Sequence, residues 1–190
     1  FVEALEALAG DVHSTLGPQA AITYGADWTE YSGYQPADGS GDRLFHLDAL
    51  WAHPSITAIG IDNYMPIADW RDEDWASGNP DGAAGPADID AMIEAIGAGE
   101  GHDWYYATPE DRAGRVRTPI TDGAYGKPWV FRFKDLKSWW VNAHYDRIAG
   151  VESPVPTAWQ PASKPIWFTE LGCPATDKGA NQPNVFPDPK

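Results

Sequence analysis

Cysteine and positive charge are both scarce in this chain of 190 residues. Cys173 is the only cysteine, so no disulfide can form within the chain. Lys and Arg number 13 against 28 Asp and Glu, for a net charge of −15. Such a charge repels phosphate backbones and anionic lipids, which argues against nucleic acid or a membrane surface as a partner. No apolar run approaches the ~20 residues of a spanning helix, and the opening FVEALEALAGDVH lacks the pattern of a secretory signal.

Aromatic residues are abundant, by contrast. Ten Trp and eight Tyr occur together with 17 Pro and 19 Gly, a mixture that favours long ordered loops carrying flat side chains. Hydrophobic residues make up 43% and charged residues 22%, as in globular domains. The length is sufficient for one domain with a substantial core.

Helix and strand signals alternate along the chain. Helical spacing of apolar residues predicts helices over residues 1–16, 44–53, 89–96 and 134–145, and Thr108-Pro109 predicts a further helix start. Nearly continuous apolar runs predict strands over residues 20–26, 56–61 and 165–169. Such strands are typical of parallel βα units whose sheet is covered by helices on both faces. The predicted fold class is therefore α/β.

The chain is too short for a closed eight-stranded βα barrel, which takes about 250 residues. It has three clear strands and an ambiguous segment at residues 129–131, and it opens within a helical pattern. We therefore predict that residues 1–190 are a single segment of a larger polypeptide, roughly the C-terminal half of a (β/α)8 TIM barrel. Residues 173–190 are predicted to be a loop-like tail. A complete small α/β enzyme is the alternative, and it would need a closed sheet from these strands alone.

Glu170 is the first candidate catalytic residue. It ends the apolar run PIWFT, and the strand carboxyl ends of βα barrels carry the active face. A carboxylate there can serve as nucleophile or base. The alternative is an acid that caps a neighbouring loop, and Trp167 either lines a pocket or belongs to the core.

Two further clusters follow the other strands. Asp62, Asn63 and Tyr64 could bind a hydroxyl or orient a carboxylate, although Asp and Asn also favour turns at strand ends. Asp27, Trp28 and Glu30 follow the first strand, where two carboxylates can divide acid and base roles. The spacing of this second cluster equally suits a surface turn.

The remaining aromatic residues have two interpretations. Trp104 and Trp129 could stack on sugar rings or pack in the core. The loop from Trp70 to Trp75 sets two large rings beside four acids and is either a rim platform or a solvated surface.

Other chemistries have little support in the sequence. The five His show no metal-ligand spacing, and no glycine-rich loop follows a strand. Cys173 is interpreted as a small buried thiol rather than a nucleophile. No cofactor and no metal are therefore predicted.

Several runs resemble one family, the TIM-barrel-like domain of gene transfer agent and prophage tail proteins, which is often described as glycoside-hydrolase-like. They are PIWFTELGCPA (165–175) with DKGANQPN (177–184), ITYGADWTEY, ITAIGIDNYMP, RTPITDGAYGKPWVFRFKDLKSWW and NAHYDR. The resemblance covers nearly the whole chain. It implies a location in the tail of a virus-like particle, with other tail or baseplate proteins and a cell-surface glycan as partners.

The same family is more distantly similar to retaining glycosidases with (β/α)8 barrels. That similarity implies a polysaccharide or peptidoglycan hydrolase with Glu170 as nucleophile at the end of the seventh strand. Asp62, Asn63 and Tyr64 would then end the sixth strand. The acid/base carboxyl of such enzymes ends the fourth strand, which would precede Phe1; otherwise Asp27 or Glu30 would supply it. The alternative is a non-catalytic glycan-binding or structural module of the particle.

Overall fold

A computed structural model describes residues 1–185 of the chain. It divides into two compact units. The first unit combines Phe1–Asn63 with Lys137–Glu170, and the second combines Tyr64–Leu136 with Leu171–Lys190. The predicted loop-like tail at 173–190 is described as far as residue 185, where it contains one 3-10 turn, η3 (Gly179–Asn181). Its last five residues lie outside the described part of the chain.

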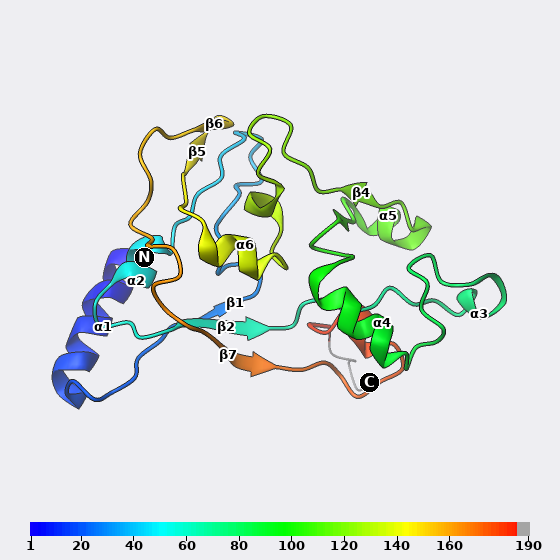
Figure 1. Cartoon of the computed structure of the whole chain (residues 1–190), viewed down its shortest axis with the longest axis horizontal. Coiled ribbons are helices and arrows are strands. Elements are labelled where there is room, and N and C mark those ends of the chain that lie inside the picture. The colour runs from blue at the N-terminus through cyan, green and yellow to red at the C-terminus, as the bar shows by residue number, and fades with distance from the viewer. Residues whose placement is uncertain (186–190) are drawn as a thin grey trace. The chain divides into compact units, whose positions relative to one another are not determined.

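A three-stranded sheet with the order β1-β2-β7 is the centre of the first unit. Its strands are β1 (Gly25–Asp27), β2 (Ile59–Asn63) and β7 (Ile166–Leu171). β1 and β2 pair in parallel, and the arrows of β2 and β7 point the same way (Figure 1). The mixed α/β class with parallel strands is thus confirmed. The described residues form an open sheet rather than a closed barrel.

The strand bounds differ from those predicted. The predicted strands at 56–61 and 165–169 are present with shifted ends, but most of the run 20–26 is not strand. Instead, Ile22 bonds the backbone of Thr57 ahead of the ladder, with its carbonyl oxygen 2.8 Å from the Thr57 amide. Sequence analysis also missed two short antiparallel strand pairs, β3-β4 (Trp104–Tyr105, Thr118–Pro119) and β5-β6 (Arg147–Ile148, Val151–Glu152).

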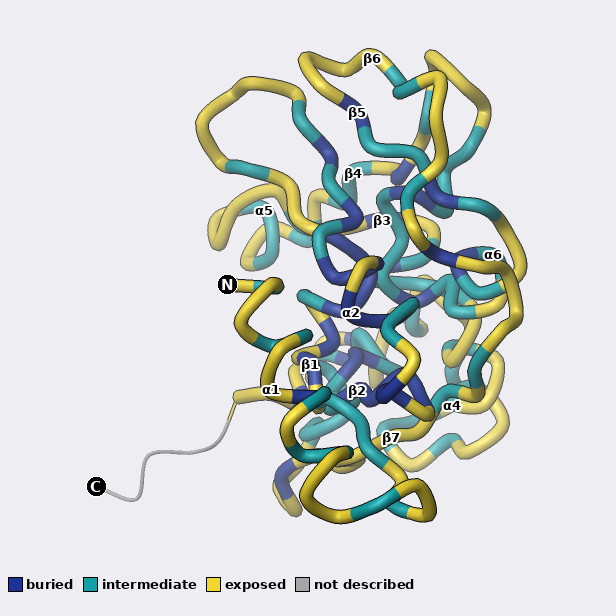
Figure 2. Tube along the Cα trace, turned by 90° about the vertical axis from the view of Figure 1, so that its left-hand side faces the viewer, coloured by how far each residue is buried: buried dark blue, intermediate teal, exposed yellow. Residues whose placement is uncertain are grey.

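Burial of the strands is uneven. Ala26 of β1 and Ile59 and Ile61 of β2 are fully buried, and Figure 2 shows dark segments at both strands. Along β7, Trp167 is 43% and Phe168 46% exposed. The expectation that helices cover both faces of every strand is therefore wrong for β7. This strand lies at the edge of the sheet, and the buried residues of the sheet are those of β1 and β2.

A cluster of aromatic rings forms part of the core of the first unit. The helices α1 (Val2–Leu16), α2 (Asp48–Ala52) and α6 (Leu136–Val141) belong to this part of the chain. His144 is fully buried between the rings of Phe45 and Trp159, and its Nδ1 lies 2.9 Å from Asp48 Oδ2. Its Nε2 lies 2.7 Å from the Trp139 carbonyl oxygen. With both ring nitrogens bonded to protein atoms, His144 is a core residue.

The helix predicted over residues 1–16 is confirmed as α1, which has no side-chain cap, and capping residues mark the starts of two further predicted helices. In the second unit, α5 (Pro109–Gly114) begins after Thr108, whose Oγ1 accepts the Asp111 amide at 3.0 Å. The helix predicted at 89–96 is α4 (Ile89–Glu94), which continues as the 3-10 turn η1 (Ala95–Gly97). The ambiguous segment is the 3-10 helix η2 (Pro128–Phe131). The loop that carries Trp70 and Trp75 contains the short α3 (Asp74–Ser77).

The predicted helices at 44–53 and 134–145 are shorter than expected. α2 begins only at Asp48, because Leu44 pairs with Tyr34 in a β-bridge, and α6 ends at Val141. Cys173 is exposed, so its interpretation as a buried thiol is wrong.

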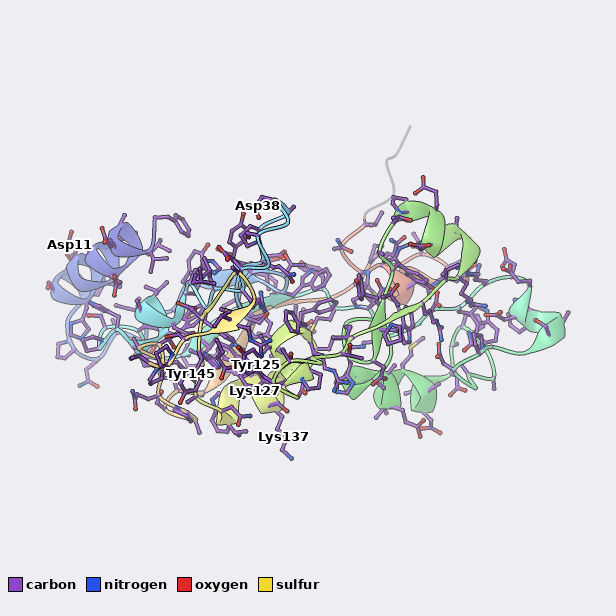
Figure 3. All side chains as sticks on the ribbon, turned by 90° about the horizontal axis from the view of Figure 1, so that it is seen from above. Asp11, Asp38, Tyr125, Lys127, Lys137 and Tyr145 are labelled. Atoms are coloured by element: carbon purple, nitrogen blue, oxygen red, sulfur yellow. The ribbon has the colours of Figure 1, made fainter. Side chains whose placement is uncertain are left out.

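Charged side chains of both signs are exposed on the surface of the first unit. Asp11 on α1 and Asp38 in a loop are exposed, and Lys137 on α6 extends away from the ribbon (Figure 3). Across residues 1–185, no helix is both long and apolar enough to cross a bilayer.

Candidate functional site

Polar side chains meet at the carboxyl ends of the parallel strands in the first unit. Asp27 and Asp62 are direct register partners on β1 and β2, so their side chains lie on the same face of the sheet. The Thr169 hydroxyl of β7 donates to Asp62 Oδ1 at 2.6 Å. One face of the strand ends therefore carries two carboxylates and a hydroxyl from three strands.

Gly25 makes room for this arrangement. A Cβ atom at position 25 would lie 3.2 Å from both Asp62 Oδ1 and Thr169 Oγ1, closer than most Cβ contacts. Because Gly25 has no side chain, the carboxylate of Asp62 has room beside β1 to bond the Thr169 hydroxyl.

Glu30 and Tyr24 form a second part of the same region. The Tyr24 hydroxyl donates to Glu30 Oε2 at 3.2 Å, and His46 Nε2 lies 3.9 Å from Glu30 Oε1. Burial raises the pKa of Tyr24, and the negative charges of Glu30 and Asp62 raise it further. The phenol thus lies within electrostatic range of both carboxylates. Sequence analysis missed Tyr24, although it stands immediately before β1 in the run ITYGAD.

Glu170 lies on the opposite face of the sheet. The Ile59 amide donates to the Pro165 carbonyl oxygen, and this bond together with the Thr169 contact sets the register of β2 against β7. That register places Glu170 beside Asn63. Because successive side chains alternate along a strand, Glu170 points away from the face that carries Thr169. Glu170 is exposed at the carboxyl end of its strand.

The other predicted residues of the first unit have distinct environments. Asp27 Oδ1 accepts hydrogen bonds from the Thr29 amide at 2.8 Å and from the Thr29 hydroxyl at 2.6 Å. These bonds form a turn at the end of β1, the alternative role that the sequence allowed for this cluster. Trp28 is 8% exposed and belongs to the core. Trp167 shares the face of Thr169 by the same alternation, and its ring is accessible to a ligand.

Three predicted binding residues belong to the second unit. Tyr64 and Trp129 are partly buried, and Trp104 is 9% exposed. The Arg117 guanidinium lies 4.0 Å from the centroid of the Trp104 ring, a cation–π contact. The first unit thus brings together Asp27 and Asp62 on one face of the strand ends, with Asn63 and Glu170 on the other. Glu30 lies beyond the end of β1.

A charged network in the second unit escaped sequence analysis. Arg115 donates from Nη1 and Nη2 to the two carboxylate oxygens of Asp74, each at 2.7 Å. Arg117 donates to Asp69 at 2.7 Å and also bonds Asp81. The hydrogen bonds from Arg115 hold the pKa of Asp74 far below its usual value. These partners lie 36 to 48 residues apart in sequence, and no local spacing indicates such pairs.

The loop from Trp70 to Trp75 is buried at one end and solvated at the other. Trp70 is 4% exposed, whereas Trp75 is 65% exposed, and the two rings form an edge-on pair with centroids 5.5 Å apart. Within residues 1–185, no group of three or more His, Cys, Asp or Glu has the arrangement of a metal site.

Parallel strands with acids gathered at their carboxyl ends define the class of βα proteins in which ligands bind at that edge. The comparison with protein families identifies one family. The model of the GTA TIM-barrel-like domain, named after gene transfer agents, matches residues 1–190, and the chain belongs to this family. A search of curated proteins finds no match to the chain.

Proposed function

We propose that this domain lets a gene transfer agent particle bind a cell-surface polysaccharide or peptidoglycan and cleave its glycosidic bonds. The observation that carries the proposal is the position of Glu170, an exposed carboxylate at the carboxyl end of a parallel strand. Membership in the family supports the particle assignment. We also propose that the domain lies in the tail of the particle, in contact with other tail or baseplate proteins.

The proposed mechanism is retaining hydrolysis. Glu170 attacks the anomeric carbon and forms a glycosyl ester as the bond to the leaving oxygen breaks. A second carboxyl, about 5–5.5 Å away, gives its proton to that oxygen and then takes one from the water that hydrolyses the ester. Asn63, beside Glu170 in the sheet, is placed to bond a sugar hydroxyl or to orient the nucleophile.

The second carboxyl has three candidates in the first unit. Asp62 is bonded to Thr169 on the face opposite Glu170, so it is poorly placed to work with the nucleophile. Asp27 lies on the Asp62 face as well. Glu30 lies beyond the end of β1 rather than in the ladder, which leaves it as the best placed of the three.

A non-catalytic glycan-binding module is the second candidate function. The arrangement on the Asp62 face favours it, since Trp167 offers an accessible ring beside the hydroxyl of Thr169 and two carboxylates. Aromatic rings with nearby polar groups can bind a sugar without cleaving it.

One experiment separates the two functions. The protein is incubated with purified peptidoglycan and, separately, with surface polysaccharide from a recipient cell. Co-sedimentation measures binding, and the appearance of reducing ends measures cleavage. We expect both. Binding without new reducing ends would support the second function and reject the catalytic one, and the absence of both would reject the whole proposal.

A further inference from the structure

The second unit contains a cavity of about 230 Å³ that none of the residues predicted to cleave a glycan enters. Drug-sized ligands occupy pockets of ~300–1,000 Å³, so this cavity suits a smaller molecule. Its apolar wall includes Trp70, Pro86, Met92 and Trp104. Two tryptophans in a cavity of this size provide flat apolar surface for a single ring.

The polar lining of the cavity is strongly acidic. Six carboxylates line it: Asp69, Asp81, Asp88, Glu94, Glu100 and Asp103. Arginines partly neutralise three of them, since Arg112 bonds Glu100 and Arg117 bonds both Asp69 and Asp81. The lining stays negative after these pairs are counted, and it therefore favours a cation over an anion.

Lys134 is the one basic residue of the lining, and it is not available to a ligand. Its buried Nζ donates to three backbone carbonyl oxygens, those of Pro66 and Ala98 at 2.7 Å and that of Ala95. An ammonium group has three N–H donors, so these bonds use all of them. Burial also lowers the pKa of Lys134 to about 8. The side chain ties the end of η1 to the loop after β2 and leaves no anion site.

One buried donor in the lining has no partner. Trp70 is 96% buried, and its indole Nε1 makes no hydrogen bond within residues 1–185. A buried unsatisfied N–H costs about 1–3 kcal/mol. An oxygen acceptor on a ligand would remove that cost. The cavity thus offers an unpaired N–H donor to a ligand oxygen and a negatively charged lining to a ligand cation.

We propose that this cavity binds a small hydroxylated ammonium compound of the amino-sugar class. The ammonium group pairs with the carboxylates at the cavity wall, with Glu94 available at the exposed end of α4. A ring or hydroxyl oxygen accepts from Trp70 Nε1, and the apolar face of the ring lies against the tryptophans. All residues that line the cavity belong to the second unit, and the proposal does not depend on any hydrolytic activity.

Three probes of similar size test the proposal by isothermal titration calorimetry. D-glucosamine carries both the ammonium group and the hydroxyls, D-glucose lacks the ammonium group, and cyclohexylamine lacks the hydroxyls. We expect glucosamine to bind with a dissociation constant on the order of millimolar and roughly tenfold more tightly than either of the others. Equal affinity for glucosamine and either other probe overturns the proposal, as does the absence of glucosamine binding.

Variants locate the binding. Glu94→Gln and the cavity-filling Ala83→Phe should each weaken glucosamine binding by roughly tenfold or more. Glu110→Gln, an exposed acid on α5, and Ala84→Phe, outside the lining, should leave it unchanged. Trp70→Phe removes the donor and keeps the ring, but Glu94→Gln decides the outcome if that variant does not fold. Glucosamine binding that is lost in Glu170→Gln instead would place the ligand at the strand ends and reject the cavity.

Discussion

Replacing Glu170 by Gln is expected to lower hydrolysis of a responsive glycan by about a thousandfold or more. The amide has nearly the shape of the carboxylate but cannot form the glycosyl ester. Glu170 is exposed at the end of an edge strand, so the change should leave the folded state intact. Glycan binding should stay within about a factor of two, because the substitution keeps the size and shape of the side chain.

Reducing-end assays at a fixed protein concentration provide the measurement for Glu170→Gln. Glu3→Gln, an exposed acid on α1, is the matched control and should keep full activity. Glu30→Gln should also reduce hydrolysis if Glu30 supplies the proton, but it should spare glycans with good leaving groups. A Glu170→Gln protein with unchanged turnover would remove this residue from the mechanism.

The Asp74→Asn variant should destabilise the second unit by about 1.5–3 kcal/mol, because it removes hydrogen bonds between charged groups in a partly buried ion pair. Asp74 is 3% exposed, and its carboxylate accepts two bonds from Arg115 and one from Asn79 Nδ2 at 2.9 Å. It also accepts the Arg71 amide at 3.0 Å. An asparagine would leave the partly buried guanidinium with Asp69 as its remaining carboxylate partner and turn an N–H₂ group toward it.

Urea unfolding of Asp74→Asn, followed by tryptophan fluorescence, measures this loss. Asp72→Asn is the control, because Asp72 is paired with Lys178 but its side chain is 84% exposed, and such pairs contribute only ~0–1 kcal/mol. Equal unfolding midpoints for the two variants would show that the Arg115 pair does not stabilise the second unit.

The same pair predicts a pH dependence. The folded-state pKa of Asp74 lies below its ordinary value, so its stabilising contribution is complete above about pH 5. It declines as the pH falls through about 4 and below, because the folded state must then take up a proton against the Arg115 bonds. Asp74→Asn should flatten this part of the stability profile.

The fold was predictable where the signal is local. Thr108 and its spacing to Asp111 identify the start of α5, because the cap and the amide it bonds are three residues apart. The apolar runs locate β2 and β7 but not their ends. Strand bounds depend on the partner strand, and Ile22 bonds Thr57 outside the ladder that the apolar run suggested.

The candidate site residues were predictable from the sequence in part, but their pairing was not. Acids that follow apolar runs indicate strand ends, and the sheet does bring Asp27 and Asp62 into register. Asp62 and Glu170 lie on opposite faces of the sheet because of the register of β2 against β7. That register depends on both strands, so neither apolar run alone predicts it. The contacts of Arg115 with Asp69 and Asp74 join segments more than 40 residues apart, so only the folded chain reveals them.

Trapping of the glycosyl intermediate tests the central claim most directly. The protein is treated with the 2-deoxy-2-fluoro glycoside of the sugar that it releases and is then digested with a protease. The masses of its peptides are measured by mass spectrometry. Retaining hydrolysis through Glu170 predicts one sugar ester on the peptide that carries WFTELG, and none in Glu170→Gln. An ester on a different carboxylate, or glycan cleavage with no ester at all, would contradict it.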